Sequence, residues 1–199
     1  MSQEIIENYL SDAIKSFRNY KRMAEKAMAQ VREEEFFRAI DAEGNSIAVI
    51  VKHIAGNQRS RWRDFLTSDG EKEDRRRDTE FELTDETRES LMQVWEQSWQ
   101  TLFEAIEPLQ AEDFSKVILI RGEPHTICEA ITRQVTHYAY HVGQITFLAK
   151  HFRATDWKTL SVPRGRSEEF NQYLAEKKAK GEQPTHALEA PQEFAEKAK

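Results

Sequence analysis

The sequence predicts an all-α protein whose main body is a four-helix bundle. Glycine and proline are scarce, with 7 and 5 in 199 residues, and they separate long segments that contain few helix breakers. Four of these segments, each of about twenty residues or more, repeat apolar side chains at steps of three and four residues, the period of an amphipathic helix. A chain of this length usually folds as one domain. We therefore expect a bundle domain over residues 1–180 and a polar C-terminal tail over residues 181–199.

The first two helices are expected at residues 2–34 and 45–66. The first carries a single apolar stripe, formed by Ile6, Tyr9, Leu10, Ala13, Ile14, Phe17, Tyr20, Ala24, Ala27, Met28 and Val31. Before the second, Gly44 supplies a break, and Asn45 and Ser46 offer side-chain oxygens that can cap a helix N-terminus.

The second half of the chain contains two more bundle helices and a short extended segment. A third helix is expected to begin near Thr84, as its N-cap, and to end before Pro108, because proline cannot continue a helix. Residues 116–120 are apolar and β-branched and lead into a turn, which predicts a hairpin arm. The last bundle helix is expected at residues 126–152 and a short C-terminal helix at 167–180. The connection over 67–83 is long, and such loops are often functional.

Charge and composition exclude several classes of protein. The chain has 35 acidic and 29 basic residues, a net charge of −6, and its basic run Arg75–Arg77 lies among acidic residues, so we expect no nucleic-acid partner and read this run as a solvated loop. No stretch of eighteen apolar residues is present, so we expect no membrane association. The acidic N-terminus is unlike a secretory signal, and Cys128, as the single cysteine, cannot form an internal disulfide. We therefore expect a cytoplasmic protein.

Two histidines four residues apart are the strongest chemical signal in the sequence. His137 and His141 lie in the last predicted bundle helix, where four residues advance the helix by about 400°, so both rings lie on one face. Such a pair is a common metal-binding element, as in zinc proteases. Here no glutamate follows the first histidine, so the protease interpretation fails.

A metal site would need a third ligand from another segment. Cys128 lies nine residues before His137 and faces the opposite side of the helix, and His151 lies about 21 Å along the axis. His125 precedes the helix, and His186 lies in the polar tail. His53, in the second predicted helix, is the remaining candidate.

The neighbours of these histidines favour a pocket. Gly56 removes bulk beside His53, and small or polar side chains share its face. The candidate pocket residues are Asn57, Ser60, Arg61, Arg133, Gln134 and Gln144. The alternative, that these histidines only form hydrogen bonds at the margin of the core, stays open at this point, and the tryptophans Trp62, Trp95 and Trp99 are interpreted as packing residues.

Several motifs resemble a bacterial branch of the DinB-like superfamily over about residues 2–175. They are NSIAVIVKHIAGN (45–57), RW (61–62), DGEK (69–72), RGEP (121–124), THYAYHVGQI (136–145), the segment 157–163 and EFN (169–171). The resemblance implies a four-helix bundle with a divalent metal ion held by three histidines, which here are His53, His137 and His141. Relatives in the superfamily include transferases and isomerases that use bacillithiol, mycothiol or glutathione.

The functional hypothesis follows from this ligand set. Three neutral imidazoles leave a divalent ion with an open position, which is typical of catalytic sites. Zinc is the expected metal, and nickel, cobalt or iron would also suit nitrogen ligands. We hypothesise a low-molecular-weight-thiol S-transferase that acts on an electrophilic substrate, with Arg61, Arg121 or Arg133 holding carboxylates of the thiol. The alternatives are a metal-dependent hydrolase and a non-catalytic metal-binding stress-response module. A homodimer is also expected, because surplus tryptophans can bury a second face.

Overall fold

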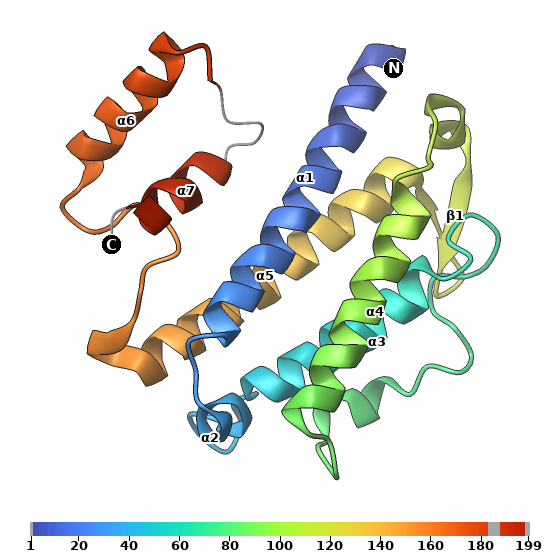
Figure 1. Cartoon of the computed structure of the whole chain (residues 1–199). Helices are drawn as coiled ribbons and strands as arrows, with labels where there is room; N and C mark the ends of the chain where they lie inside the picture. The colour runs from blue at the N-terminus through green and yellow to red at the C-terminus, as the bar shows by residue number, and fades with distance from the viewer. Residues whose placement is uncertain (1, 183–187, 198–199) are drawn as a thin grey trace.

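The computed structural model describes residues 2–182 and 188–197 and is built almost entirely of helices (Figure 1). The α-helices are α1 (Gln3–Met28), α2 (Glu33–Phe37), α3 (Ile47–Trp62), α4 (Arg88–Ile106), α5 (Ile127–Arg153), α6 (Ser167–Ala179) and α7 (Glu189–Lys197). Three 3₁₀ turns are η1 (Arg77–Phe81), η2 (Ala111–Ser115) and η3 (Ala154–Asp156), and the strands are β1 (Val117–Ile120) and β2 (Glu123–Thr126). In the bundle, α1 packs along α5 and α3 packs along α4. The predicted all-α bundle is confirmed.

The start of each site-bearing helix is fixed by a side-chain cap. Ser46 Oγ accepts a hydrogen bond from the backbone N–H of Val49 at 3.2 Å and begins α3, as predicted. Thr126 begins α5 in the same way, and the carboxylate of Glu129 accepts the Thr126 N–H in return at 2.8 Å. Such reciprocal caps satisfy backbone donors that the helix cannot bond internally.

The helix expected over 45–66 ends four residues early, at Trp62. Two further predicted helix boundaries were wrong. The expected helix over 2–34 stops at Met28, and a separate short helix follows, because the Glu35 carboxylate accepts the backbone N–H of Arg32 at 2.9 Å and starts a new helix there. The expected N-cap Thr84 does not cap α4; its backbone N–H donates to the Glu86 carboxylate instead, and Thr87 caps the helix three residues later. At the end of α1 the apolar pattern continues past Met28. Before α4 the acidic residues that follow Thr84 resemble the first turn of a helix.

Each bundle helix contributes at least one aromatic side chain to the core. These are Phe17 from α1, Trp62 from α3, Trp99 from α4 and Tyr138 from α5, and none is more than 1% exposed. Ring centroids of Phe17 lie 5.9 Å from Trp62 and 5.7 Å from Tyr138. The prediction that the tryptophans are packing residues is confirmed, and Trp95 is likewise fully buried.

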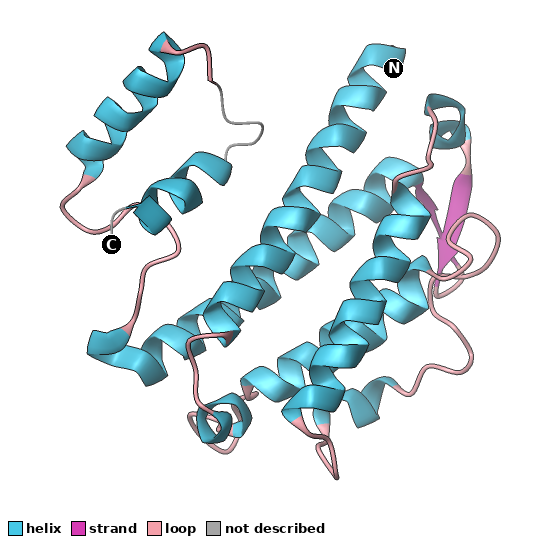
Figure 2. Ribbon diagram, in the orientation of Figure 1, coloured by secondary structure: helices cyan, strands magenta, loops and turns pink. Residues whose placement is uncertain are grey.

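The predicted hairpin arm is confirmed and lies along the side of the bundle, in contact with α5 (Figure 2). Strands β1 and β2 are antiparallel, with Ile120 opposite Glu123, so Arg121 and Gly122 form a two-residue turn. Both have positive φ angles, 57° and 76°, as tight hairpin turns require. The backbone N–H of Gly70 donates to the carbonyl of Leu119 at 2.8 Å, which ties the long loop after α3 to the edge of this hairpin.

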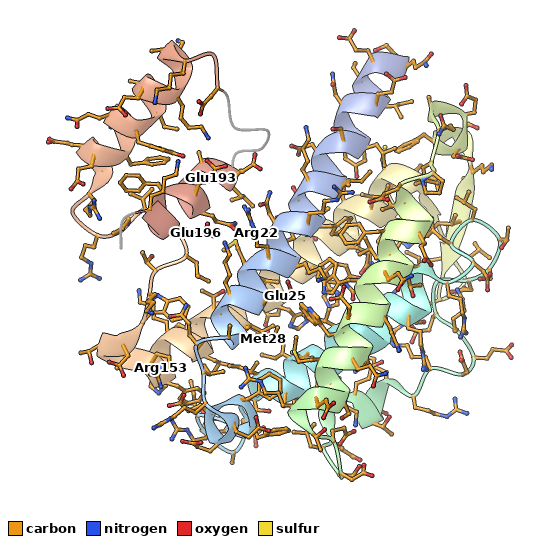
Figure 3. All side chains as sticks on the ribbon, in the orientation of Figure 1. Arg22, Glu25, Met28, Arg153, Glu193 and Glu196 are labelled. Carbon is orange, nitrogen blue, oxygen red and sulfur yellow. The ribbon has the colours of Figure 1, made fainter. Side chains whose placement is uncertain are left out.

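Helices α6 and α7 form an antiparallel pair outside the four bundle helices (Figure 3). Phe194 of α7 packs on Phe170 and Tyr173 of α6. Glu196 of α7 forms an ion pair with Lys26 of α1. The interval expected as a polar tail therefore contains a helix with a buried apolar side, whereas His186 lies outside the described residues. Among the helices that the structure describes, none combines the length and the apolar character that crossing a membrane demands.

Candidate metal centre

Three histidines from two helices meet at one point between α3 and α5. The Nε2 atom of His137 lies 3.4 Å from Nε2 of His53 and 3.1 Å from Nε2 of His141. One ligand atom from each ring lies within 4.8 Å of the other two. His53 is buried, and the other two rings are half-buried. The structure thus brings together the three residues that the sequence singled out.

The other described histidines lie away from this cluster. His125 pairs with Ile118 across the hairpin, and His151 is exposed and stacks on Phe147. Cys128 is half-buried on α5, where its backbone carbonyl accepts a hydrogen bond from the hydroxyl of Tyr9.

A buried hydrogen-bond chain fixes α5 against α3 beside the histidines. The indole N–H of Trp62 donates to the hydroxyl of Tyr138 at 3.1 Å, and this hydroxyl donates to Oδ1 of Asn57 at 3.0 Å. Tyr138 is adjacent to His137, and Asn57 lies one helical turn after His53. This contact therefore sets the distance between the imidazole of His53 on α3 and the two imidazoles on α5.

Two of the rings are oriented by acceptors on their far side. His53 Nδ1 lies 2.8 Å from Oε2 of Glu80, and His141 Nδ1 lies 2.7 Å from Oε1 of Gln144. Carboxylate and amide oxygens only accept, so both rings donate from Nδ1 and keep a lone pair on Nε2. Such outer contacts fix the tautomer and direction of a metal-binding imidazole.

Glu80 is the functional residue that the sequence analysis missed. It lies in η1, within the long loop, and Arg75 binds both of its oxygens, at 2.8 Å and 2.9 Å. The Arg75 side chain is only 4% exposed, so the interpretation of this arginine run as a solvated loop was wrong for its first member. Burial acts to raise the pKa of Glu80, but hydrogen bonds from His53 and Arg75 hold that pKa below its ordinary value.

Gly56 provides the space that Glu80 occupies. A Cβ at this position would lie 2.4 Å from Oε1 of Glu80, which is closer than non-bonded atoms approach. Gly56 was expected to leave room beside His53, and in the structure this room is filled by the carboxylate that supports His53. Only glycine lets this loop approach α3 so closely.

Electrostatics keep the α5 imidazoles neutral. Burial, together with the other two histidines, lowers the pKa of His137 from 6.5 to about 3. Burial also lowers the pKa of His141 to about 4, although its hydrogen bond with Gln144 acts in the opposite direction. At neutral pH these rings therefore present lone pairs, the form in which histidine binds metal ions.

The cluster fits a divalent ion by both spacing and donor type. Atoms that lie about 2.05 Å from a tetrahedral ion are about 3.3 Å apart; Nε2 of His137 lies 3.4 Å and 3.1 Å from the other two Nε2 atoms, and the three ligand atoms all lie within 4.8 Å of one another. The lone pairs on His53 and His141 face Nε2 of His137, which can donate at most one proton. A shared cation would satisfy all three nitrogens at once.

A pocket of about 450 Å³ opens beside the cluster. Four of the predicted pocket residues line it: Asn57, Arg61, Arg133 and Gln134. Gln144 instead supports His141, and Ser60 anchors the long loop by donating to the carbonyl of Gly70 and accepting from the N–H of Lys72. The six candidates therefore divide between lining the pocket and holding its walls.

The fold and this site define the chain as a helical-bundle protein with a three-histidine cluster of metal-binding geometry. A family model described as "Protein of unknown function (DUF1572)" matches residues 4–166, and the chain belongs to this family. The match covers every bundle helix and the hairpin and ends just before α6. No curated protein and no solved structure matches the chain.

Proposed function

We propose that this protein binds a divalent metal ion through His53, His137 and His141 and transfers a low-molecular-weight thiol to an electrophile. We further propose that its family is a branch of the DinB-like superfamily, whose members include thiol-dependent transferases. The arrangement of one histidine on the second bundle helix and two, four residues apart, on the last supports this relationship.

The observation that carries the proposal is the convergence of three Nε2 atoms whose rings are fixed from behind. A histidine that only fills a core margin needs one hydrogen-bond partner. His53 and His141 already have that partner in Glu80 and Gln144, yet both direct their remaining nitrogen at His137.

A bound divalent ion would supply a positive charge that lowers the pKa of a coordinated thiol or water. In the transfer, the thiol loses its proton to water, its sulfur forms a bond to the electrophilic carbon, and the leaving group departs with the electrons of its own bond. The residues of this chain hold the imidazoles in place, and the arginines beside them bind the substrate. Zinc is the expected ion by availability; nickel, cobalt and iron suit the same donors.

The hydrolase alternative would require a base beside the attacking water. Glu80 is the buried carboxylate that contacts the histidine cluster. Its oxygens already accept hydrogen bonds from His53 and from Nε and Nη2 of Arg75. This engagement favours the transferase over the hydrolase.

Elemental analysis of purified protein tests the metal site. Wild type should carry about one equivalent of a divalent metal, and His53→Ala and His137→Ala should each lose it while keeping their helical circular dichroism. His151→Ala is the matched control, because this histidine is exposed on the same helix and outside the cluster. Metal retained in His53→Ala and His137→Ala would refute the shared site.

Thiol-dependent loss of a model electrophile such as monochlorobimane then tests the reaction. We expect turnover with metal-loaded wild type and none with His137→Ala. If metal-loaded wild type neither consumes the electrophile with a panel of small thiols nor binds those thiols, the transferase assignment fails. Ester or amide turnover without thiol would support the hydrolase, and metal-dependent folding without any turnover would support a structural metal-binding module.

A further inference from the structure

Five arginine side chains from separate parts of the chain line the pocket beside the three histidines. They are Arg61 from α3, Arg75 and Arg77 from the long loop and η1, Arg121 from the hairpin turn and Arg133 from α5. No aspartate or glutamate is among the described residues that line this pocket. Guanidinium groups bind carboxylate and phosphate oxygens through paired hydrogen bonds, so this lining is suited to an anion.

Arg61 is the interior member of this group. It is 4% exposed, and its Nε and Nη1 atoms are buried without a hydrogen-bond partner among the described residues. The nearest carboxylate oxygen, on Glu71, lies 3.8 Å from Nη2. A buried cation normally has its hydrogen bonds satisfied, because an unsatisfied one costs free energy. Arg61 also lines the pocket, so an anion bound there would add a counter-charge for this buried guanidinium group.

The backbone around Arg61 is shaped to hold its guanidinium group. A Cβ on Gly70 would lie 2.6 Å from Nη1 of Arg61, so a larger residue would displace it. Gly70 cannot easily move away, because its N–H binds Leu119 and its carbonyl binds Ser60.

Two further arginines lie at the exposed edge of the pocket. The Asp69 carboxylate accepts the backbone N–H groups of Arg121 and Gly122, at 2.8 Å and 2.7 Å, and so fixes the turn that carries Arg121. The Arg133 side chain is exposed and forms no hydrogen bond or ion pair with any residue that the structure describes. The Arg133 guanidinium group can therefore turn toward a ligand at little cost, whereas that of Arg121 also contacts Glu71 at 3.4 Å.

Nearby carboxylates neutralise only part of this charge. Glu80 and Glu71 bind Arg75, and Glu71 also lies 3.4 Å from Arg121 and 3.8 Å from Arg61. Asp78 lies 3.9 Å from Arg77, so five guanidinium groups share three carboxylates in direct contact, and the excess charge faces the pocket. In a partly enclosed site such an excess attracts anions more strongly than on an open surface.

We propose that this pocket binds a small molecule bearing carboxylate or phosphate groups, with Arg61 at its inner end and Arg121 and Arg133 at its outer edge. This inference names the substrate class for the proposed function and rests on it for the role of the histidines. The arginines alone define the anion site, however, so the two proposals can fail separately.

Calorimetric titration of the 199-residue chain, both as purified and after removal of metal, tests the inference. The probes are succinate, inorganic phosphate and, as an uncharged counterpart, succinamide, at low ionic strength. We expect at least one anion to bind the metal-free protein with one-to-one stoichiometry and succinamide not to bind. Preference for succinate or for phosphate then identifies the anionic group.

Variants separate these arginines from non-specific charge. Arg121→Gln and Arg133→Gln should each weaken anion binding about tenfold, the lower end of what a charge-assisted hydrogen bond contributes. Arg61→Lys keeps the charge but loses the paired donors and should weaken it at least as much. Arg59→Gln is the matched control, because this exposed arginine of α3 does not line the pocket, and it should leave the affinity unchanged.

The outcomes are distinguishable. No anion binding by metal-free wild type, or an equal loss in Arg59→Gln, would overturn the anion site. So would binding that appears only with metal, disappears in His137→Ala and survives in Arg133→Gln, since the anion would then sit on the ion. Anion binding by a protein in which elemental analysis finds no metal as purified would support the anion site and refute the metal-dependent function, whereas anion binding after deliberate removal of the metal leaves that function intact.

Discussion

Replacing Gly56 with alanine tests how the loop supports His53, because two physical effects predict opposite signs. Alanine is favoured over glycine inside a helix by about 1 kcal/mol. The new Cβ would, however, lie 2.4 Å from the Glu80 carboxylate, which is bound by His53 and Arg75. Hydrogen bonds to charged groups contribute about 1.5–3 kcal/mol each. We therefore expect Gly56→Ala to lower the free energy of unfolding by about 1–2 kcal/mol.

The assay is urea unfolding of the metal-free protein, followed by circular dichroism, with Gly143→Ala as the matched control. Gly143 also lies inside a helix, but apart from its chain neighbours and the adjacent helix backbone no heavy atom lies within 4 Å of a Cβ built there. This control should gain up to about 1 kcal/mol of stability.

A double-mutant cycle with Glu80→Ala identifies the cause. In the Glu80→Ala background the obstruction is gone, so Gly56→Ala should become stabilising, by up to about 1 kcal/mol. If Gly56→Ala stabilises the wild-type protein as much as Gly143→Ala does, the carboxylate does not occupy this space and the reasoning is wrong.

Three further predictions concern the site and its surroundings. Tyr138→Phe should lower the free energy of unfolding by about 1–3 kcal/mol in urea, because two buried partners lose their hydrogen bond. Tyr140→Phe, at an exposed residue, should change it by less than about 0.5 kcal/mol. Equal effects of the two variants would refute the buried network. Lys52 lowers the pKa of Glu86 from 4.5 to about 2, so this carboxylate stabilises the fold above about pH 4.5 and loses that contribution as pH falls toward 2. Glu86→Gln should then cost about 1–2 kcal/mol at pH 7, after allowance for partial exposure, and nothing near pH 2; a pH-independent difference would contradict this. Glu80→Gln should weaken metal binding about 10- to 100-fold in a chelator competition. Glu86→Gln is the control, because it removes the same charge from the same connection between α3 and α4. Equal metal affinities of the two variants would show that Glu80 does not orient His53.

The helices and the three histidines were predictable because both depend on helical periodicity. The spacing of His137 and His141 places both rings on one face, and the polar face around His53 distinguishes it from an ordinary core residue. Helix ends were less predictable. The apolar stripe of α1 continues to Val31, past the turn after Met28, and whether Thr84 or Thr87 caps α4 depends on where the preceding loop is held.

The support for the site was not predictable, because it comes from a loop without a repeating pattern. Glu80 lies 27 residues after His53, and neither its burial nor that of Arg75 follows from local composition. Charged residues in a mixed run are usually solvated, and here pairing with each other allows both to be buried. Gly56 was the available signal: a glycine one turn from a candidate ligand, inside a helix, indicates that another segment approaches closely.

One connection, between the end of α3 at Trp62 and the start of α4 at Arg88, carries Glu80, which holds His53, and also Gly70, Glu71 and Arg75, which shape the arginine pocket. Local opening of this connection would therefore break the contact of Glu80 with His53 and remove Arg75 from the pocket in a single event, while the aromatic core of the bundle stayed packed. Native-state hydrogen exchange would register such an opening as amides of this stretch that exchange together and well before those of α1 and α5. A ligand that contacts both the histidine cluster and the arginine pocket would slow the exchange of these amides. Their exchange rate would therefore measure how much of the site is occupied.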